Sequence, residues 1–133
     1  MSSHSDDAMR TSELLLSRKE ELAHAVTDAL YADDPGLLER FGEAGRAKCL
    51  QDMRYCLEHL APALALDDPP LFERYVRWLE SLLAVRGIGS RDVRRSLEIT
   101  ARVIAERFQP DQAASALLCL RAGVACLSDD PAP

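Results

Sequence analysis

Apolar residues recur every three or four positions through most of the chain, and short polar breaks containing proline or glycine separate these stretches. This spacing places apolar side chains on one face of an α-helix. No stretch shows the two-residue alternation rich in Val, Ile and Thr that is typical of strands. Because the breaks are short, consecutive helices are expected to pack side by side. The pattern therefore predicts an all-α protein, an up-down antiparallel helical bundle of four to five helices.

The polar breaks also set the expected helix boundaries. A first helix is expected from about residue 12 to 32. The stretch 36–45 predicts a short helix that Gly42 and Gly45 weaken, and a longer helix should follow over 46–66.

The clearest helical unit is 69–86, where Asp68 and two prolines form the entry and Gly87 is suited to a left-handed stop. Two further helices are expected over 90–108 and 110–127, opened by Ser90 and Pro110 respectively.

The last predicted helix departs from the amphipathic pattern, because Arg121 is its only charged residue between positions 113 and 127. A helix that is apolar all round is usually buried on every side, which is hard to arrange in a small domain. One interpretation is a face for self-association or for docking a protein partner. That face would consist of Leu118, Cys119, Ala122 and Cys126. The alternative is that this helix is the central one of the bundle.

Length and charge narrow the class of protein. A chain of 133 residues suits one domain. We expect that domain over 12–127, with disordered polar tails at 1–11 and 128–133. The formal net charge of −6 at pH 7 disfavours binding to nucleic acid or to an anionic membrane surface. No apolar run approaches the roughly 20 residues that span a bilayer.

The N-terminal stretch "MSSHSDDAMRTSE" lacks the apolar segment of a signal peptide, so a cytoplasmic location is expected. Four cysteines in such a setting are expected to be reduced thiols. Basic charge is carried almost wholly by arginine, which suggests a GC-rich bacterial genome.

Motifs for catalysis or metal binding are absent from the sequence, so no catalytic residue and no metal site are predicted. In "AKCLQDMRYCLEHLAPAL", only Cys56 and His59 have a spacing that suits two ligands of one ion, and Cys49 lies further along the helix. The cysteines also suit small apolar core residues. His59 remains a candidate axial ligand for a haem or another tetrapyrrole.

Two further groups are candidates for binding. Phe72, Tyr75 and Trp78 could form a wall that contacts a ligand or a partner, although residues of this kind also occur in ordinary cores. A set of arginines could hold an anion or an acidic partner, but it is interleaved with acidic residues as on a solvated helix face. The set consists of Arg86, Arg91, Arg94 and Arg95.

The run "DMRYCLEHLAPALALDDPPLFERYVRWLESLLAVRGI" resembles the N-terminal four-helix half of bacterial cobalamin-binding, methionine-synthase-type sensors and regulators. The resemblance covers roughly residues 12–108. It rests on helix lengths, an Asp-Asp-Pro entry and a Tyr-Val-x-Trp helix. It implies a bundle that caps the upper face of cobalamin. Ile88 and Gly89 stand where light-sensing members carry Glu-His, and the Asp-x-His-x-x-Gly motif is not found in this sequence.

These observations predict a non-enzymatic signalling or regulatory module of the bacterial cytoplasm that works by binding. Its expected partner is a second copy of itself or another protein, with contact through the C-terminal helix, and no cofactor is expected. The alternative is a cofactor-binding sensor that holds haem or a cobalamin-type tetrapyrrole in the bundle, with His59 as ligand.

Overall fold

A computed structural model describes residues 3–128 of the chain, which form six α-helices and no strand. The helices are α1 (Ser3–Ser17), α2 (Lys19–Asp33), α3 (Gly36–Ala65), α4 (Pro69–Val85), α5 (Ser90–Arg107) and α6 (Pro110–Ala125). The prediction of an all-α bundle is confirmed, but the described part of the chain has six helices where the pattern indicated four to five.

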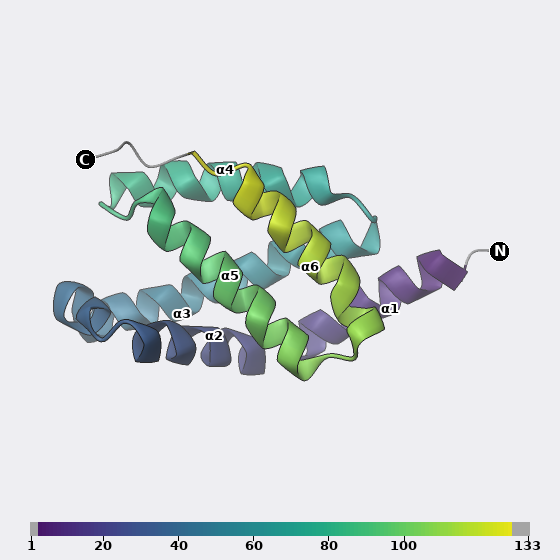
Figure 1. Ribbon diagram of the computed structural model, residues 1–133, viewed down its shortest axis with the longest axis horizontal. Helices are drawn as coiled ribbons and strands as arrows, with labels where there is room; N and C mark the ends of the chain where they lie inside the picture. Colours follow the sequence, from purple (N-terminus) through teal and green to yellow (C-terminus); the bar gives the residue numbers. More distant parts are fainter. Residues whose placement is uncertain (1–2, 129–133) are drawn as a thin grey trace.

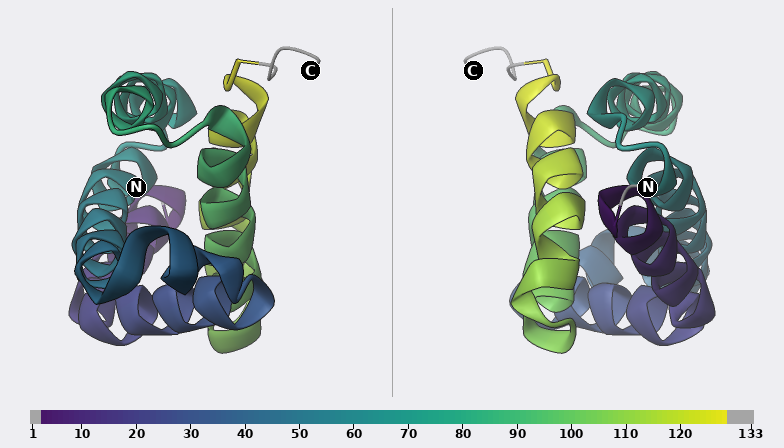
Figure 2. Two further views of the ribbon diagram at one scale, coloured as in Figure 1. Left: turned by 90° about the vertical axis from the view of Figure 1, so that its left-hand side faces the viewer. Right: turned by 90° about the vertical axis from the view of Figure 1, so that its right-hand side faces the viewer.

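The longest helix, α3, organises the packing. α1 and α2 both pack along α3, one after the other. α4, which follows α3 in the chain, also lies against it. α5 and α6 form a hairpin that crosses these helices obliquely, with α5 on α2 and α6 on α4 (Figures 1 and 2). The bundle therefore contains two groups of helices that cross.

The N-terminal part differs from the sequence-based expectation. The tail expected over 1–11 is helical from Ser3, and residues 1–2 lie outside the described part. The single helix expected over 12–32 is divided at Arg18, whose dihedrals leave the helical region (φ −108°, ψ 14°). Thr11 and Ser12 are buried, and the Ser12 hydroxyl donates a 2.7 Å hydrogen bond to the carbonyl of Ala61. This contact and the complete burial of Leu15 attach α1 to the rest of the bundle.

The two helices expected over 36–45 and 46–66 are joined into α3, with a break at Gly42. Gly42 has φ 68° and ψ −173°, a combination that only glycine adopts readily. The six residues before it, 36–41, form a short arm that is redirected relative to the rest of α3. The Asp34 carboxylate accepts the Gly36 N–H at 3.1 Å and so caps the start of this arm.

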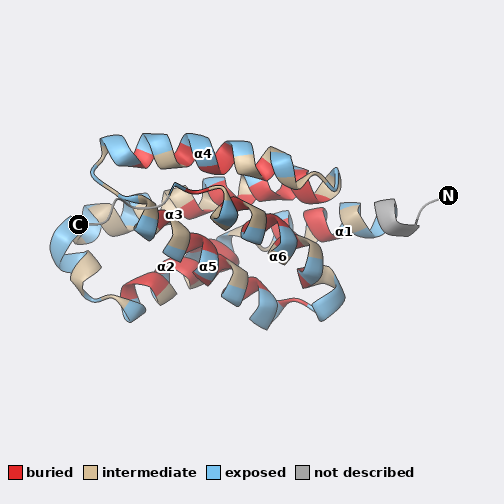
Figure 3. Ribbon diagram, turned by 45° about the horizontal axis from the view of Figure 1, so that its top comes forward, coloured by how far each residue is buried: buried red, intermediate tan, exposed pale blue. Residues whose placement is uncertain are grey.

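The core is formed where the apolar stripes of the six helices meet (Figure 3). The inner face of α5 is buried and consists of Val93, Leu97, Thr100 and Ile104, with Phe108 buried directly after the helix. α4 and α6 approach closely at Gly123, where an added Cβ would lie 2.9 Å from Val76 and 3.0 Å from Phe72. Glycine is therefore what allows these two helices to touch.

Two findings bear on the remaining expectations. Within residues 3–128 there is no helix long and apolar enough to cross a membrane. Of the tail expected over 128–133, Ser128 is described, and its backbone N–H donates to the Glu80 carboxylate at 2.9 Å. Residues 129–133 lie outside the described part.

Candidate functional site

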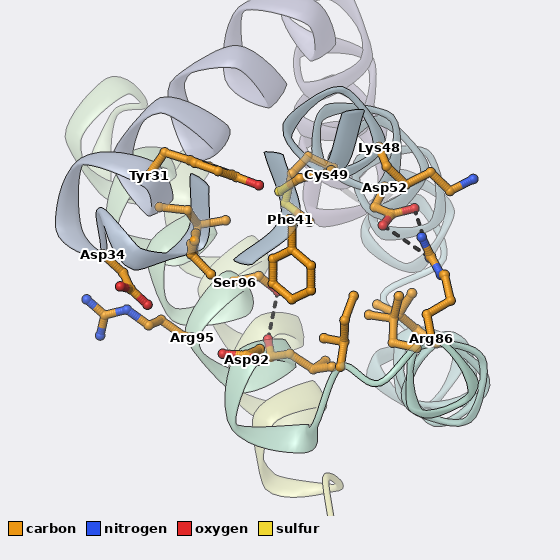
Figure 4. Close-up of a pocket in the computed structure, with 18 of the residues that line it drawn as sticks. Tyr31, Asp34, Phe41, Lys48, Cys49, Asp52, Arg86, Asp92, Arg95 and Ser96 are labelled. Carbon is orange, nitrogen blue, oxygen red and sulfur yellow. Dashed lines mark hydrogen bonds and ion pairs between the residues drawn. The ribbon is translucent and has the colours of Figure 1, made fainter. Parts of the chain in front are cut away.

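An apolar pocket of about 450 Å³ lies between α2, the two parts of α3, α4 and the start of α5 (Figure 4). Its walls are mainly aliphatic and aromatic side chains. They are Leu30, Leu37, Phe41, Ala44, Met53, Leu79, Leu83, Ile88 and Val93. A concave, largely apolar space of this size with a few polar groups at its edges is the usual form of a small-molecule site.

The break at Gly42 creates one wall of the apolar pocket. It redirects the arm 36–41, and Leu37 and Phe41 of this arm line the pocket together with Leu30 and Met53. Gly45 completes the arrangement, because a Cβ at this position would lie 2.3 Å from the Cβ of Phe41. The two glycines thus let the arm fold back closely on its own helix. A continuous helix through residue 42 would carry Phe41 elsewhere.

The two ends of the apolar pocket carry charge. At one end Arg86 approaches both carboxylate oxygens of Asp52, at 3.3 and 3.5 Å, with Lys48 beside them. Desolvation by burial raises the pKa of Asp52, and the nearby Arg86 guanidinium opposes that rise. At the other end stand Asp34 and Arg95. A ligand in the apolar pocket therefore meets charged groups at its two ends.

Two polar groups face the interior of the apolar pocket. The Tyr31 hydroxyl points into it and has no hydrogen-bond partner among the residues that the structure describes. Arg46 lies over the Tyr31 ring, 4.9 Å from its centroid, and holds the ring in place. The second group is the thiol of Cys49, whose pKa burial raises to about 11. The site thus offers one free hydroxyl and a neutral thiol.

The aromatic wall expected from the sequence lies elsewhere, on the junction of α3 and α4. Phe72 is fully buried and belongs to the core, whereas Trp78 is 56% exposed. Tyr75 stands between them, with ring centroids 5.7 Å from Phe72 and 6.0 Å from Trp78. The three residues do adjoin one another, but only Trp78 presents a broad surface to solvent.

His59 joins this aromatic cluster and does not line the apolar pocket. Its ring stacks on Tyr75, and Nδ1 lies 2.8 Å from the carbonyl oxygen of Tyr55. The pocket lining contains no histidine, so it offers no imidazole as an axial ligand for a tetrapyrrole. Over the described residues, no group of three or more His, Cys, Asp or Glu side chains is placed to hold one metal ion.

The association face expected on α6 is divided between core and surface. Cys119 is only 3% exposed and is buried within the monomer. Its inclusion in a surface is therefore wrong. Leu118 is 55% exposed, and Ala122 and Cys126 are partly buried. The Cys126 thiol donates to the carbonyl of Gly123 at 3.1 Å.

Sequence reasoning missed the apolar pocket. Its walls come from four helices, and the residues concerned are those that a core would also use. The available signal was the pair Gly42 and Gly45, which the sequence indicated only as a weakness in helical continuity. Their effect depends on where α4 and α5 lie, and the local sequence does not specify that.

Comparison with known protein families and with curated proteins found no match to this chain.

Proposed function

We propose that this chain is a non-enzymatic, regulatory binding module of the bacterial cytoplasm that takes a small, mainly apolar ligand in the pocket between α2, α3, α4 and α5. The observation that carries the proposal is the pocket itself, about 450 Å³ in volume and walled by aliphatic and aromatic side chains. Burying an eight-carbon chain there would contribute about 6 kcal/mol, at about 0.8 kcal/mol per CH2, before the entropic costs of association.

The lining supports binding in preference to catalysis. Catalysis by a nucleophile needs a base within hydrogen-bond reach or a lowered pKa. Cys49 has neither, because its pKa is raised to about 11 and no histidine lines the pocket. The carboxylate of Asp52 is occupied by Arg86. Asp52 and Arg86 are suited to orienting one end of a ligand.

A neutral apolar dye tests the proposal directly. N-phenyl-1-naphthylamine should bind with saturable, one-to-one stoichiometry and fluoresce strongly in the apolar pocket. Ala44 lines the pocket and is exposed, so Ala44→Trp should fill the space without disturbing the core. The matched control is Ala105→Trp, at an exposed position of α5 outside the lining.

Dye binding should be lost in Ala44→Trp and retained in Ala105→Trp, with unchanged helical circular dichroism in both. Absence of saturable binding by the unmodified protein, or equal binding by both variants, would contradict the proposal.

We also propose that a second copy of the chain docks on the outer face of α6. Leu118 is 55% exposed there and Ala122 is beside it one turn on, in a helix whose described segment carries few charges. Leu118→Glu should leave the fold intact and convert a dimer to a monomer in light scattering. A monomer at high protein concentration before any substitution would overturn this second proposal.

A further inference from the structure

A second pocket, of about 580 Å³, adjoins the apolar one and is lined by charged side chains alone. We call it the charged pocket. Its residues are Asp33, Asp34, Arg40, Arg91, Asp92, Arg94, Arg95 and Glu98. Asp34, Asp92 and Arg95 line both pockets. In Figure 4, Asp34 and Arg95 stand at the end of the apolar pocket opposite Asp52 and Arg86. The two pockets therefore share one boundary, formed by these side chains.

The carboxylates of the charged pocket are largely engaged by other partners. Asp33 is shared by Arg95 and Arg102, each at 3.4 Å. Asp92 lies 3.9 Å from Arg40. Asp34 accepts the backbone N–H of Gly36. Three of the four acidic groups thus already have cationic or N–H partners.

Two of the four arginines have no such partner. In the part of the chain that the structure describes, neither Arg91 nor Arg94 forms an ion pair with a carboxylate. Arg94 acts on Glu80 only through the field of its charge, as one of several causes that lower the pKa of that carboxylate. The guanidinium donors of Arg91 and Arg94 are therefore available to a ligand. At the opposite end of the apolar pocket, fewer guanidinium donors are available to a ligand, because Arg86 is already paired with Asp52.

We propose that the two pockets form one composite site for an amphiphile with a phosphorylated head group. The apolar body would lie in the apolar pocket, and the phosphate would lie in the charged pocket against Arg91 and Arg94. Guanidinium groups bind phosphate oxygens in pairs of parallel, charge-assisted hydrogen bonds, which favours this head group over an uncharged one. This inference rests on the proposed function, since it specifies the ligand of the same site.

Octyl phosphate and octanol have the same eight-carbon chain. Comparing them separates binding in the apolar pocket from recognition of the phosphate in the charged pocket. Calorimetric titration of the unmodified protein should show octyl phosphate binding roughly ten-fold or more tightly than octanol, as charge-assisted hydrogen bonds would give. The double variant Arg91→Gln/Arg94→Gln should lose that preference and bind octanol unchanged. The matched control is Arg74→Gln/Arg121→Gln, which removes the same charge from two exposed arginines on α4 and α6.

Each other result is decisive. Equal affinity for octyl phosphate and octanol in the unmodified protein overturns the composite site and leaves the proposed function intact. A phosphate preference that survives in Arg91→Gln/Arg94→Gln, or is lost equally in the control, overturns the assignment to the charged pocket. If octanoate binds as tightly as octyl phosphate, the claim that the site prefers a phosphate over other anionic head groups is overturned. Failure of all three ligands to bind counts against the proposed function itself.

Discussion

The imidazole of His59 stacks on the ring of Tyr75, with centroids 4.3 Å apart and planes 14° from parallel. The stack joins α3 to α4 near the surface, and the contact of Nδ1 with the Tyr55 carbonyl oxygen fixes the orientation of the imidazole. His59 therefore covers a face of Tyr75 that water would otherwise reach.

Replacing His59 by alanine should lower the free energy of unfolding by about 0.5–1.5 kcal/mol, because the ring contact is lost. His59→Phe should keep most of that energy, since a flat ring remains. Urea unfolding followed by circular dichroism measures both. His24→Ala, at an exposed position of α2, is the control and should be close to neutral. Equal losses in His59→Ala and His59→Phe would show that the stack contributes nothing.

The hydroxyl of Tyr75 is buried and has no hydrogen-bond partner in the described residues. Burial also raises the pKa of this group far above its usual range. An unpaired buried hydroxyl costs free energy on folding. Tyr75→Phe should therefore leave the free energy of unfolding unchanged or raise it by about 1 kcal/mol. A clear loss in urea unfolding would indicate that the hydroxyl has a partner in solution.

Gly42→Ala should separate stability from ligand binding. Its dihedrals disfavour any residue with a Cβ, so the substitution should cost about 1–3 kcal/mol. If the chain relieves this strain by rotating the arm 36–41, Leu37 and Phe41 move with it. The affinity for the dye should then fall. Gly89→Ala is the control, because a Cβ there meets no atom within 4 Å and its φ is negative. Unchanged dye affinity in Gly42→Ala would mean that the arm is not a wall of the binding site.

Glu21 links α2 to α5 and gives a defined acid response. Hydrogen bonds from Arg18 and then Arg107 lower the pKa of its carboxylate from 4.5 to about 2. Because the folded-state pKa is depressed, the stabilisation is fully present above pH 4.5 and is lost as the pH falls through about 2.

The thermal midpoint of Glu21→Gln should therefore lie below that of the unmodified protein at neutral pH, and the gap should close between pH 4.5 and 2. The effect is expected to be small and to weaken with salt, because these side chains are exposed. Glu106→Gln, at an exposed position of α5, should show no such closing.

The thiols provide a chemical test of pocket occupancy. Burial raises the pKa of Cys49 to about 11 and that of Cys56 to about 12, so all labelling by N-ethylmaleimide should be slow at neutral pH. Cys49 and Cys126 are partly exposed and should react before the buried Cys56 and Cys119. Octanol should protect Cys49, which lines the pocket, and leave Cys126 unprotected. Peptide mass spectrometry measures each site separately, and equal protection of both thiols would contradict the assignment.

The sequence predicted those parts of the fold that depend on local preferences. Gly87 has the positive φ of 79° expected of a left-handed stop, and α4 begins at Pro69 directly after Asp68, as expected. Ser90 begins α5 as expected, but its hydroxyl donates to Glu80 on α4 and does not cap the helix. The hydrogen-bond partner of Ser90 is therefore a residue ten positions earlier, and the sequence pattern that predicts a helix start does not include that residue.

Contacts between residues far apart in the sequence also determine the position of α1 and the shape of the candidate site. α1 is attached to α3 by a hydrogen bond from Ser12 to Ala61, across 49 positions, and no periodicity within 1–11 signals it. Arg95 of α5 pairs with Asp33 at the end of α2, and both residues line the charged pocket. The sequence supplied Arg91, Arg94 and Arg95 as candidates, whereas the apolar pocket beside them required the positions of four helices.

Trp78, the chain's single tryptophan, is placed so that it can report on ligand binding from a distance. It lies outside the pocket lining, while its neighbour Leu79 and, further along α4, Leu83 form part of that lining. A ligand cannot quench Trp78 by contact from within the pocket. A shift in tryptophan emission on titration with octanol, which does not absorb tryptophan fluorescence, would therefore indicate that α4 moves when the pocket is filled.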